Sequence, residues 1–415
     1  MSAPAAPPEK KRINLRTPEV MAAVLKQVES HYRSELVDRV IAKGGIVSRN
    51  GLTIRLAQKF GFCYGVERAI DMAYAARKYF PTEQRLFILG EIIHNPEVNE
   101  QIAAMGIKNL IGPHKEAEID HLRPDDVVIV PAFGAETHTI DRIKNIGCHI
   151  VDTTCGDVMS VWRRVRGYAQ ESFTSIIHGK SEHEETKATA SRALGPGGNG
   201  HFLVVLTLAD TDYVCEYIRN GGDKEEFLAK FGPGARSVGF DPDVHLRSVG
   251  VANQTTMLRS ETEDVQRRIR QAIVDRDGPE MGEKNFRFFD TICGATQERQ
   301  DALFDLLKLP MDLMIVVGGY NSSNTSHLAE IGENCLPTYF IRNASRLESR
   351  EKVTHYNLHL RREVTTDNWF PEKEQVVIGL TAGASCPNHL IEETILRLFE
   401  LRGIPTSDLV ASLTA

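Results

Sequence analysis

The stretch Val151–Trp162, VDTTCGDVMSVW, changes character at its cysteine. An apolar run ends in Asp-Thr-Thr, Cys155 follows, and the apolar residues beyond it recur at helical spacing. Two other stretches have the same order, LTIRLAQKFGFCYGVERAI around Cys63 and FRFFDTICGATQERQDALFDLL around Cys293. Three strand–cysteine–helix junctions in one chain predict three related α/β units.

The three junctions also suggest a metal site. Ligands of open α/β sheets gather at the carboxyl ends of strands, and a helix N-terminus favours the thiolate that binds metal. One cysteine alone is usually a small buried hydrophobe, but three in a shared context favour an iron–sulfur cluster, zinc or copper(I). Electron-transfer [4Fe–4S] centres use four cysteines, so three would leave an open, catalytic position. Zinc bound by three cysteines is a minor alternative, since local C-x-x-C spacing is absent.

Composition restricts the class of protein. The chain has 415 residues, a formal net charge of -7 and seven widely spaced cysteines. The charge gives no support to a nucleic-acid partner, and an odd, scattered set of cysteines argues against a disulfide framework. We find no membrane span and no signal peptide in the sequence, so we expect a cytoplasmic location.

The domain organisation follows from the junctions. Residues 1–50 comprise a disordered tail (1–16) and a helical arm, in which a helix over Met21–Ala42 stops at Gly44-Gly45. We expect this arm to be a packing arm or an oligomer contact. The first α/β unit then covers 51–155, the second 156–292, and the third 293–415 with a C-terminal tail. We interpret LGPGGNG and the passage through GPGARSVGFDPD in the second unit as surface insertions.

Polar side chains recur where the predicted strands end. Each could simply be a helix N-cap, but their repetition at the ends of all units favours an anion site built from helix N-termini. Because no G-x-x-x-x-G-K-[ST] motif is present, we expect a small phosphorylated or diphosphorylated ligand rather than a nucleoside triphosphate. The residues are His94, His183, Thr255, Thr256, Ser322, Ser323, Asn324 and Ser385.

Glu185 is the candidate proton donor. It lies in the sequence HEET, beside a histidine, and burial near a metal site could adjust its pKa. A solvated acidic loop fits Glu182 and Glu184 better, but the sequence alone does not choose among the three.

Eight motifs in order, between about Leu52 and Leu401, carry a resemblance to a known family. They are GFCYGVERAI, EIIHNPEV, DTTCGDVMSVW, IIHGKSEHEETKAT, NQTTM, FDTICGATQERQDA, GGYNSSNTSHLAE and TAGASCP. The chain resembles the 4-hydroxy-3-methylbut-2-enyl diphosphate reductases, the last enzymes of the methylerythritol phosphate route to isoprenoids. The resemblance implies a trefoil of three α/β units around one [4Fe–4S] cluster held by Cys63, Cys155 and Cys293. It also implies reductive removal of the substrate's 4-hydroxyl as water, giving isopentenyl and dimethylallyl diphosphate.

The resemblance assigns roles to individual residues. His94, His183, Ser322, Asn324 and Ser385 would hold the diphosphate, with Ser323 adjoining. Thr255 and Glu185 would lie near the hydroxyl, with Glu185 as the proton source, and Thr296 near the cluster.

Two departures from the family pattern stand out. Many bacterial members have Ala-His-Gly where this chain has Ala132-Phe133-Gly134, and His-Pro-Glu where it has His183-Glu184-Glu185. Both forms resemble the plant and cyanobacterial branch.

Two other classes of function remain open. An aconitase-like hydro-lyase also uses three cysteines and an open iron but needs no reductant. A non-catalytic iron–sulfur sensor should bind nucleic acid or a partner, which neither charge nor a helix-turn-helix supports. For the reductase, the resemblance implies ferredoxin or flavodoxin as the electron donor. No G-x-G-x-x-G fingerprint follows a strand, so we expect the electrons to come from outside the chain.

Overall fold

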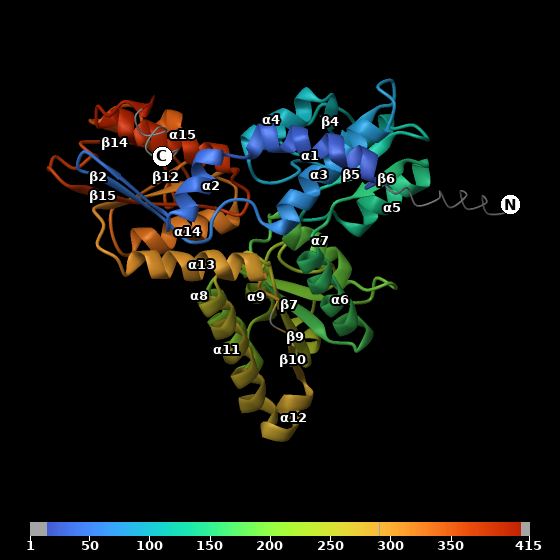
Figure 1. Cartoon of the computed structure of the whole chain (residues 1–415). Helices are drawn as coiled ribbons and strands as arrows, with labels where there is room; N and C mark the ends of the chain where they lie inside the picture. Colours follow the sequence, from blue (N-terminus) through green and yellow to red (C-terminus); the bar gives the residue numbers. More distant parts are fainter. Residues whose placement is uncertain (1–14, 290, 408–415) are drawn as a thin grey trace. The chain divides into compact units, whose positions relative to one another are not determined.

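The computed structural model describes residues 15–289 and 291–407 (Figure 1). The chain forms two bodies, each with its own core. The two-sheet body contains residues 83–90, 107–289 and 291–293. The five-strand body contains residues 15–82, 91–106 and 294–407.

The first sheet of the two-sheet body has four parallel strands. Its order is β4 (Ile107–Asn109), β3 (Leu86–Ile88), β5 (Val127–Val130) and β6 (His149–Asp152). Helix α5 (Thr137–Ile146) connects β5 to β6, and a short 3₁₀ helix, η1 (Ile119–His121), precedes β5. All four residues of β5 are buried, as expected for a central parallel strand.

The second sheet of this body is also parallel. Its order is β10 (Phe286–Phe288), β9 (Val249–Asn253), β7 (Thr174–His178) and β8 (Phe202–Val205). Helices α8 and α11 lie side by side (Figure 1). The helices are α6 (Gly156–Gln170), α7 (Glu184–Ala193), α8 (Leu208–Asn220), α9 (Lys224–Lys230), α10 (Pro242–His245), α11 (Arg259–Asp277) and α12 (Pro279–Lys284).

The passage predicted as a surface insertion is partly buried, which corrects that prediction. The backbone N–H of Val204 in β8 donates to the carbonyl of Ala235, and the N–H of Ser237 donates to the carbonyl of Phe202. The segment therefore covers the edge strand β8, whose backbone groups would otherwise be unpaired. Next to it, the rings of His201 and His245 stack with centroids 3.5 Å apart.

The five-strand body is built on one mixed sheet. Its order is β1 (Ile46–Arg49), β2 (Leu52–Leu56), β15 (Val376–Ala382), β11 (Leu313–Val317) and β12 (Thr338–Ile341), with only β1 antiparallel. A separate hairpin joins β13 (Lys352–Asn357) to β14 (Arg362–Asp367). The helices of the five-strand body are α1 (Pro18–Tyr32), α2 (Glu35–Ala42), α3 (Tyr64–Tyr79), α4 (Pro96–Ala104), α13 (Gly294–Leu307), α14 (Ser323–Glu333), α15 (Asn388–Leu401) and the 3₁₀ helix η2 (Ala344–Arg346).

The position of β2 differs from the predicted boundaries. The sequence analysis placed Leu52–Leu56 in the first unit, whereas β2 pairs with β15, Leu52 opposite Val376. Helix α3, which follows β2 and begins after Cys63, belongs to the same body. Pairing between residues more than 300 positions apart has no local sequence signal, so the sequence patterns did not predict that β2 pairs with β15.

The N-terminal arm is two helices rather than the one predicted. Arg33 is extended, and the Ser34 hydroxyl accepts a hydrogen bond from the N–H of Val37, so Ser34 caps a new helix. Tyr32 is 4% exposed, and its hydroxyl lies 2.9 Å from that of Tyr74 in α3. The arm thus packs within its own body. Most of the predicted disordered tail, residues 1–14, lies outside the described residues, but Leu15 is buried.

The predicted α/β fold is confirmed: in the described residues two sheets are wholly parallel, and the five-stranded sheet is parallel except for β1. No helix in the described ranges is long and apolar enough to cross a membrane.

Candidate active site

The three predicted cluster cysteines each precede a helix directly. Cys63 precedes α3, Cys155 precedes α6, and Cys293 precedes α13. All three are partly exposed, and each backbone N–H donates to a carbonyl of another loop: Cys63 to Ala384 (3.2 Å), Cys155 to Ala132 (2.8 Å) and Cys293 to Thr255 (3.3 Å). Cys63 belongs to the five-strand body and the other two to the two-sheet body. The convergence of the three thiols therefore stays a prediction.

The other four cysteines have different surroundings. Cys148, Cys215 and Cys386 are buried, and Cys335 is exposed at the end of α14. Burial raises the pKa of Cys215 to about 12 and that of Cys386 well above its usual value. Cys215 lies within α8 and not directly before a helix, so it lacks the strand–cysteine–helix setting of the three candidate ligands.

Glu185 and Thr255 form a buried hydrogen-bonded pair in the two-sheet body. Glu185 is 3% exposed and Thr255 4%. The Thr255 N–H donates to Glu185 Oε1 at 2.6 Å, and its hydroxyl donates to Oε2 at 3.0 Å. The Thr255 carbonyl accepts from the N–H of Cys293. One residue therefore connects the candidate proton donor to a candidate cluster ligand.

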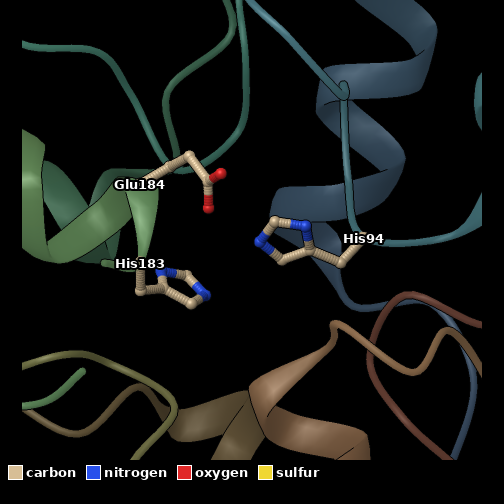
Figure 2. Close-up of side chains that lie close together, drawn as sticks. All are labelled: His94, His183 and Glu184. Carbon is tan, nitrogen blue, oxygen red and sulfur yellow. The ribbon is translucent and has the colours of Figure 1, made fainter. Parts of the chain in front are cut away.

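His183 fixes the start of α7, on which the acid lies. Its Nδ1 accepts a hydrogen bond from the N–H of Glu185 at 3.1 Å, which makes the imidazole an N-cap. Figure 2 shows the side chains of His183 and Glu184 projecting from the start of α7. Glu184 is exposed and Glu185 is buried. This difference in burial distinguishes the two acids as candidate proton donors, which the sequence alone could not do.

Phe133 lies beside His183 in the same body. The two rings meet edge to face with centroids 6.3 Å apart, and Phe133 is 8% exposed. At this position the chain therefore offers an apolar edge where many bacterial members offer an imidazole.

The start of α14 gathers four predicted residues in the five-strand body. The Ser322 hydroxyl caps the helix, and the Ser385 hydroxyl lies 3.3 Å from it. Asn324 Oδ1 accepts from the N–H of Ala384. Within the part of the chain that the structure describes, neither the Ser323 hydroxyl nor the Asn324 amide nitrogen has a hydrogen-bond partner, and both residues are 3% exposed. Buried donors at a helix N-terminus suit an anion that would accept from them.

His94 lies on the loop before α4, in the same body (Figure 2). Its Nδ1 is 2.9 Å from Glu91 Oε2, which also accepts from the Asn321 side chain at 2.6 Å. The His94 carbonyl accepts from the Ser385 hydroxyl at 3.1 Å. The structure therefore brings five predicted residues together beyond the carboxyl ends of β11 and β15. They are His94, Ser322, Ser323, Asn324 and Ser385.

The two remaining threonines have separate surroundings. Thr256 accepts a hydrogen bond from the Gln254 side chain at 2.9 Å. Thr296, in the first turn of α13, is 1% exposed.

Sequence reasoning missed Arg299. This α13 residue is 4% exposed and donates to the carbonyls of Gly61 (2.6 Å) and Phe62 (3.1 Å). It thereby fixes the backbone directly before Cys63. The only sequence signal was a cation on the otherwise buried face of a helix, and its partners lie 238 and 237 residues away.

The fold is that of an α/β protein whose polar residues gather beyond the carboxyl ends of parallel strands, where open α/β sheets commonly bind ligands. The chain belongs to the LytB protein family, whose sequence model matches residues 54–399. This confirms the resemblance inferred from the motifs.

Curated relatives agree with this membership. The chain is 46% identical to a protein of Thermosynechococcus vestitus named 4-hydroxy-3-methylbut-2-enyl diphosphate reductase, over 92% of this chain and 93% of that protein. It is also 46% identical to a protein of the same name from Gloeobacter violaceus, over 95% and 94%.

Two solved structures share the fold. One is described as (E)-4-hydroxy-3-methyl-but-2-enyl diphosphate reductase, with a TM-score of 0.51 and 25% identity over 84% of this chain and 99% of that one. The other is the E-1-hydroxy-2-methyl-but-2-enyl-4-diphosphate reductase from Plasmodium falciparum, with a TM-score of 0.60 and 20% identity over 85% and 89%.

Proposed function

We propose that this chain reduces (E)-4-hydroxy-3-methylbut-2-enyl diphosphate to isopentenyl and dimethylallyl diphosphate, the last step of the methylerythritol phosphate route. The observation that carries the proposal is the pair of Glu185 and Thr255. The buried carboxyl group of Glu185 is held by Thr255, whose own carbonyl accepts a hydrogen bond from the N–H of Cys293. Such an arrangement suits proton delivery next to a cysteine-bound metal centre.

The cysteines fit a [4Fe–4S] cluster. Three partly exposed thiols, each directly before a helix, offer the soft ligands that iron–sulfur clusters require. When bound by Cys63, Cys155 and Cys293, the cluster would supply a Lewis-acidic iron and a path for electrons. Arg299 would act as a positioning residue, because it holds the backbone before Cys63.

The diphosphate would bind at the start of α14. The Ser323 hydroxyl and the Asn324 amide would donate to phosphate oxygens, and the helix N-terminus would offset their charge. Ser322, Ser385 and His94 would complete this subsite from the same body. His183 would contribute from α7, and Phe133 beside it would replace the bacterial imidazole with an apolar contact.

The reaction breaks the allylic C–O bond. Two electrons and two protons enter, the hydroxyl leaves as water, and the allylic carbon skeleton takes the second proton. Glu185 would protonate the leaving oxygen, and the Thr255 hydroxyl would orient its carboxyl group. Thr256 and Thr296 would border the reacting end of the substrate.

The electrons would come from an external donor, a ferredoxin or a flavodoxin. The sequence has no dinucleotide fingerprint after a strand, so the chain would not hold a nicotinamide or flavin of its own. We also propose a cytoplasmic, reducing location, because none of the cysteines, all within the described ranges, forms a disulfide.

An anaerobic turnover assay tests the proposal. The purified protein is incubated with the allylic diphosphate, with and without dithionite-reduced methyl viologen, and the products are separated by chromatography. We expect both five-carbon diphosphates only with reductant. Turnover without reductant would instead indicate a hydro-lyase, and a loaded but inactive protein would reject the proposal.

A further inference from the structure

A cavity lies in the two-sheet body beside the loop of Cys155, whose neighbours Thr154 and Gly156 line it. It has a volume of about 550 Å³ and is lined by residues of β5, β6, α5, α6 and α7. None of the residues assigned above to the cluster, the diphosphate or proton transfer lines it. Cavities of this size accommodate small organic ligands.

Two buried donors on the wall of this cavity have no acceptor. Arg192 is 8% exposed and Trp162 6%, and within the described ranges neither Arg192 Nε nor Trp162 Nε1 has a hydrogen-bond partner. The Arg192 guanidinium lies 3.4 Å from the centre of the Trp162 ring.

Arg192 remains charged in this setting. Burial and the neighbouring Arg166 lower its pKa to about 10, which still leaves the guanidinium protonated at neutral pH. A second nitrogen of the group donates to the carbonyls of Ala135 (2.7 Å) and Ala188 (2.8 Å), so its position is fixed. A fixed, buried cation is a strong anchor for an anion.

The charge around the cavity is positive although the chain is acidic overall. Exposed Lys144, Arg163 and Arg166 line it together with Arg192, against one carboxylate, Asp152. The net charge of the whole chain is -7. The other lining residues are mainly apolar and include Met159 and the Trp162 ring. Cationic groups beside an apolar wall match a ligand that has an anionic head and a hydrocarbon chain.

We propose that this cavity is a second ligand site, which binds a phosphate or diphosphate ester with a short hydrocarbon chain. Arginine pairs with phosphate oxygens through two parallel N–H groups, and the apolar wall covers the chain. The cavity adjoins the loop of Cys155, but none of the proposed ligand residues lines it, and the proposal does not depend on the proposed reaction.

Tryptophan fluorescence tests the site without reference to turnover. The chain has two tryptophans, so Trp369→Phe in the full-length protein leaves Trp162 as the only indole. We expect geranyl diphosphate to change the Trp162 emission saturably, and inorganic diphosphate and neutral geraniol to bind at least ten-fold more weakly. Absence of a saturable change, or equal binding of inorganic diphosphate, would overturn the proposal.

Charge reversal provides a matched pair of variants. Arg163 and Arg164 are adjacent and exposed on α6, but only Arg163 lines the cavity. Arg163→Glu should weaken geranyl diphosphate binding at least five-fold, and Arg164→Glu should leave it within two-fold. Equal affinities in the two variants would mean that the Trp162 signal arises elsewhere, which rejects the cavity as the site.

Discussion

Replacement of Glu185 by Gln tests the proposed proton donor with little change in shape. The Thr255 N–H, 2.6 Å from Oε1, can donate equally well to an amide oxygen. The Thr255 hydroxyl, 3.0 Å from Oε2, can rotate to accept from the amide nitrogen. We therefore expect Glu185→Gln to fold and to retain the proposed cluster.

The expected effect on turnover is large. A positioned general acid contributes roughly 10²- to 10⁴-fold to a rate, which corresponds to about 3–5 kcal/mol of activation free energy. The neutral amide cannot release a proton to the leaving oxygen, so kcat should fall by this factor. The substrate's KM should change less, because the diphosphate would be held mainly by other side chains.

The neighbouring acid provides the control. Glu184 is exposed on the same turn of α7, and Glu184→Gln removes the same charge without touching Thr255. Turnover is measured anaerobically with reduced methyl viologen at equal iron content, and we expect the control to stay within about three-fold of the parent. The reasoning is refuted if Glu185→Gln stays within ten-fold of the parent, or if Glu184→Gln loses more activity.

Three further predictions concern stability. Gly134 has φ +82, and an added Cβ would overlap the Trp162 ring, so Gly134→Ala should lower the free energy of unfolding by about 3 kcal/mol or more. Gly112→Ala, with φ +85 but open space, should cost about 1 kcal/mol in the same denaturant titration, and equal losses would contradict the steric argument. Tyr32→Ala should lower the free energy of unfolding by about 3–5 kcal/mol, because the ring is buried against α3. Leu25→Ala, on the exposed side of α1, should lower it by less than about 1 kcal/mol. Similar melting temperatures for the two variants would show that the N-terminal arm is not packed against α3. Burial and the stacked histidine lower the pKa of His245, so the unfolded chain takes up a proton below about pH 6.5 that the folded chain resists. The contribution of neutral His245 to stability is complete above that pH and is lost as the pH falls toward the folded pKa. The melting temperature should therefore drop more between pH 7 and pH 5.5 in the parent than in His245→Gln. Parallel curves of melting temperature against pH would refute this.

Local sequence signals predicted the parts of the site that depend on neighbouring residues. The apolar run, cysteine and helical spacing placed Cys155 between β6 and α6. The polar cluster after Gly319 predicted the start of α14, and Ser322 caps it. These features follow from strand and helix periodicity and from capping chemistry, which a single sequence carries.

Contacts between distant residues were outside the reach of the same reasoning. Glu185 and Thr255 are 70 residues apart, and Arg299 and Gly61 are 238 apart. The sequence could not choose between Glu184 and Glu185, because burial of the second depends on Thr255. Side-chain pairing across such separations is set by the packed fold, and no period or spacing along the chain encodes it.

The most direct test of the central claim is an iron and sulfide count on anaerobically purified protein. The parent should contain roughly four iron and four sulfide per chain. Cys63→Ser, Cys155→Ser and Cys293→Ser should each lose most of both, whereas Cys335→Ser, at an exposed cysteine, should keep them. A full complement in any of the first three variants, or its loss in the fourth, would contradict the assignment of the cluster ligands.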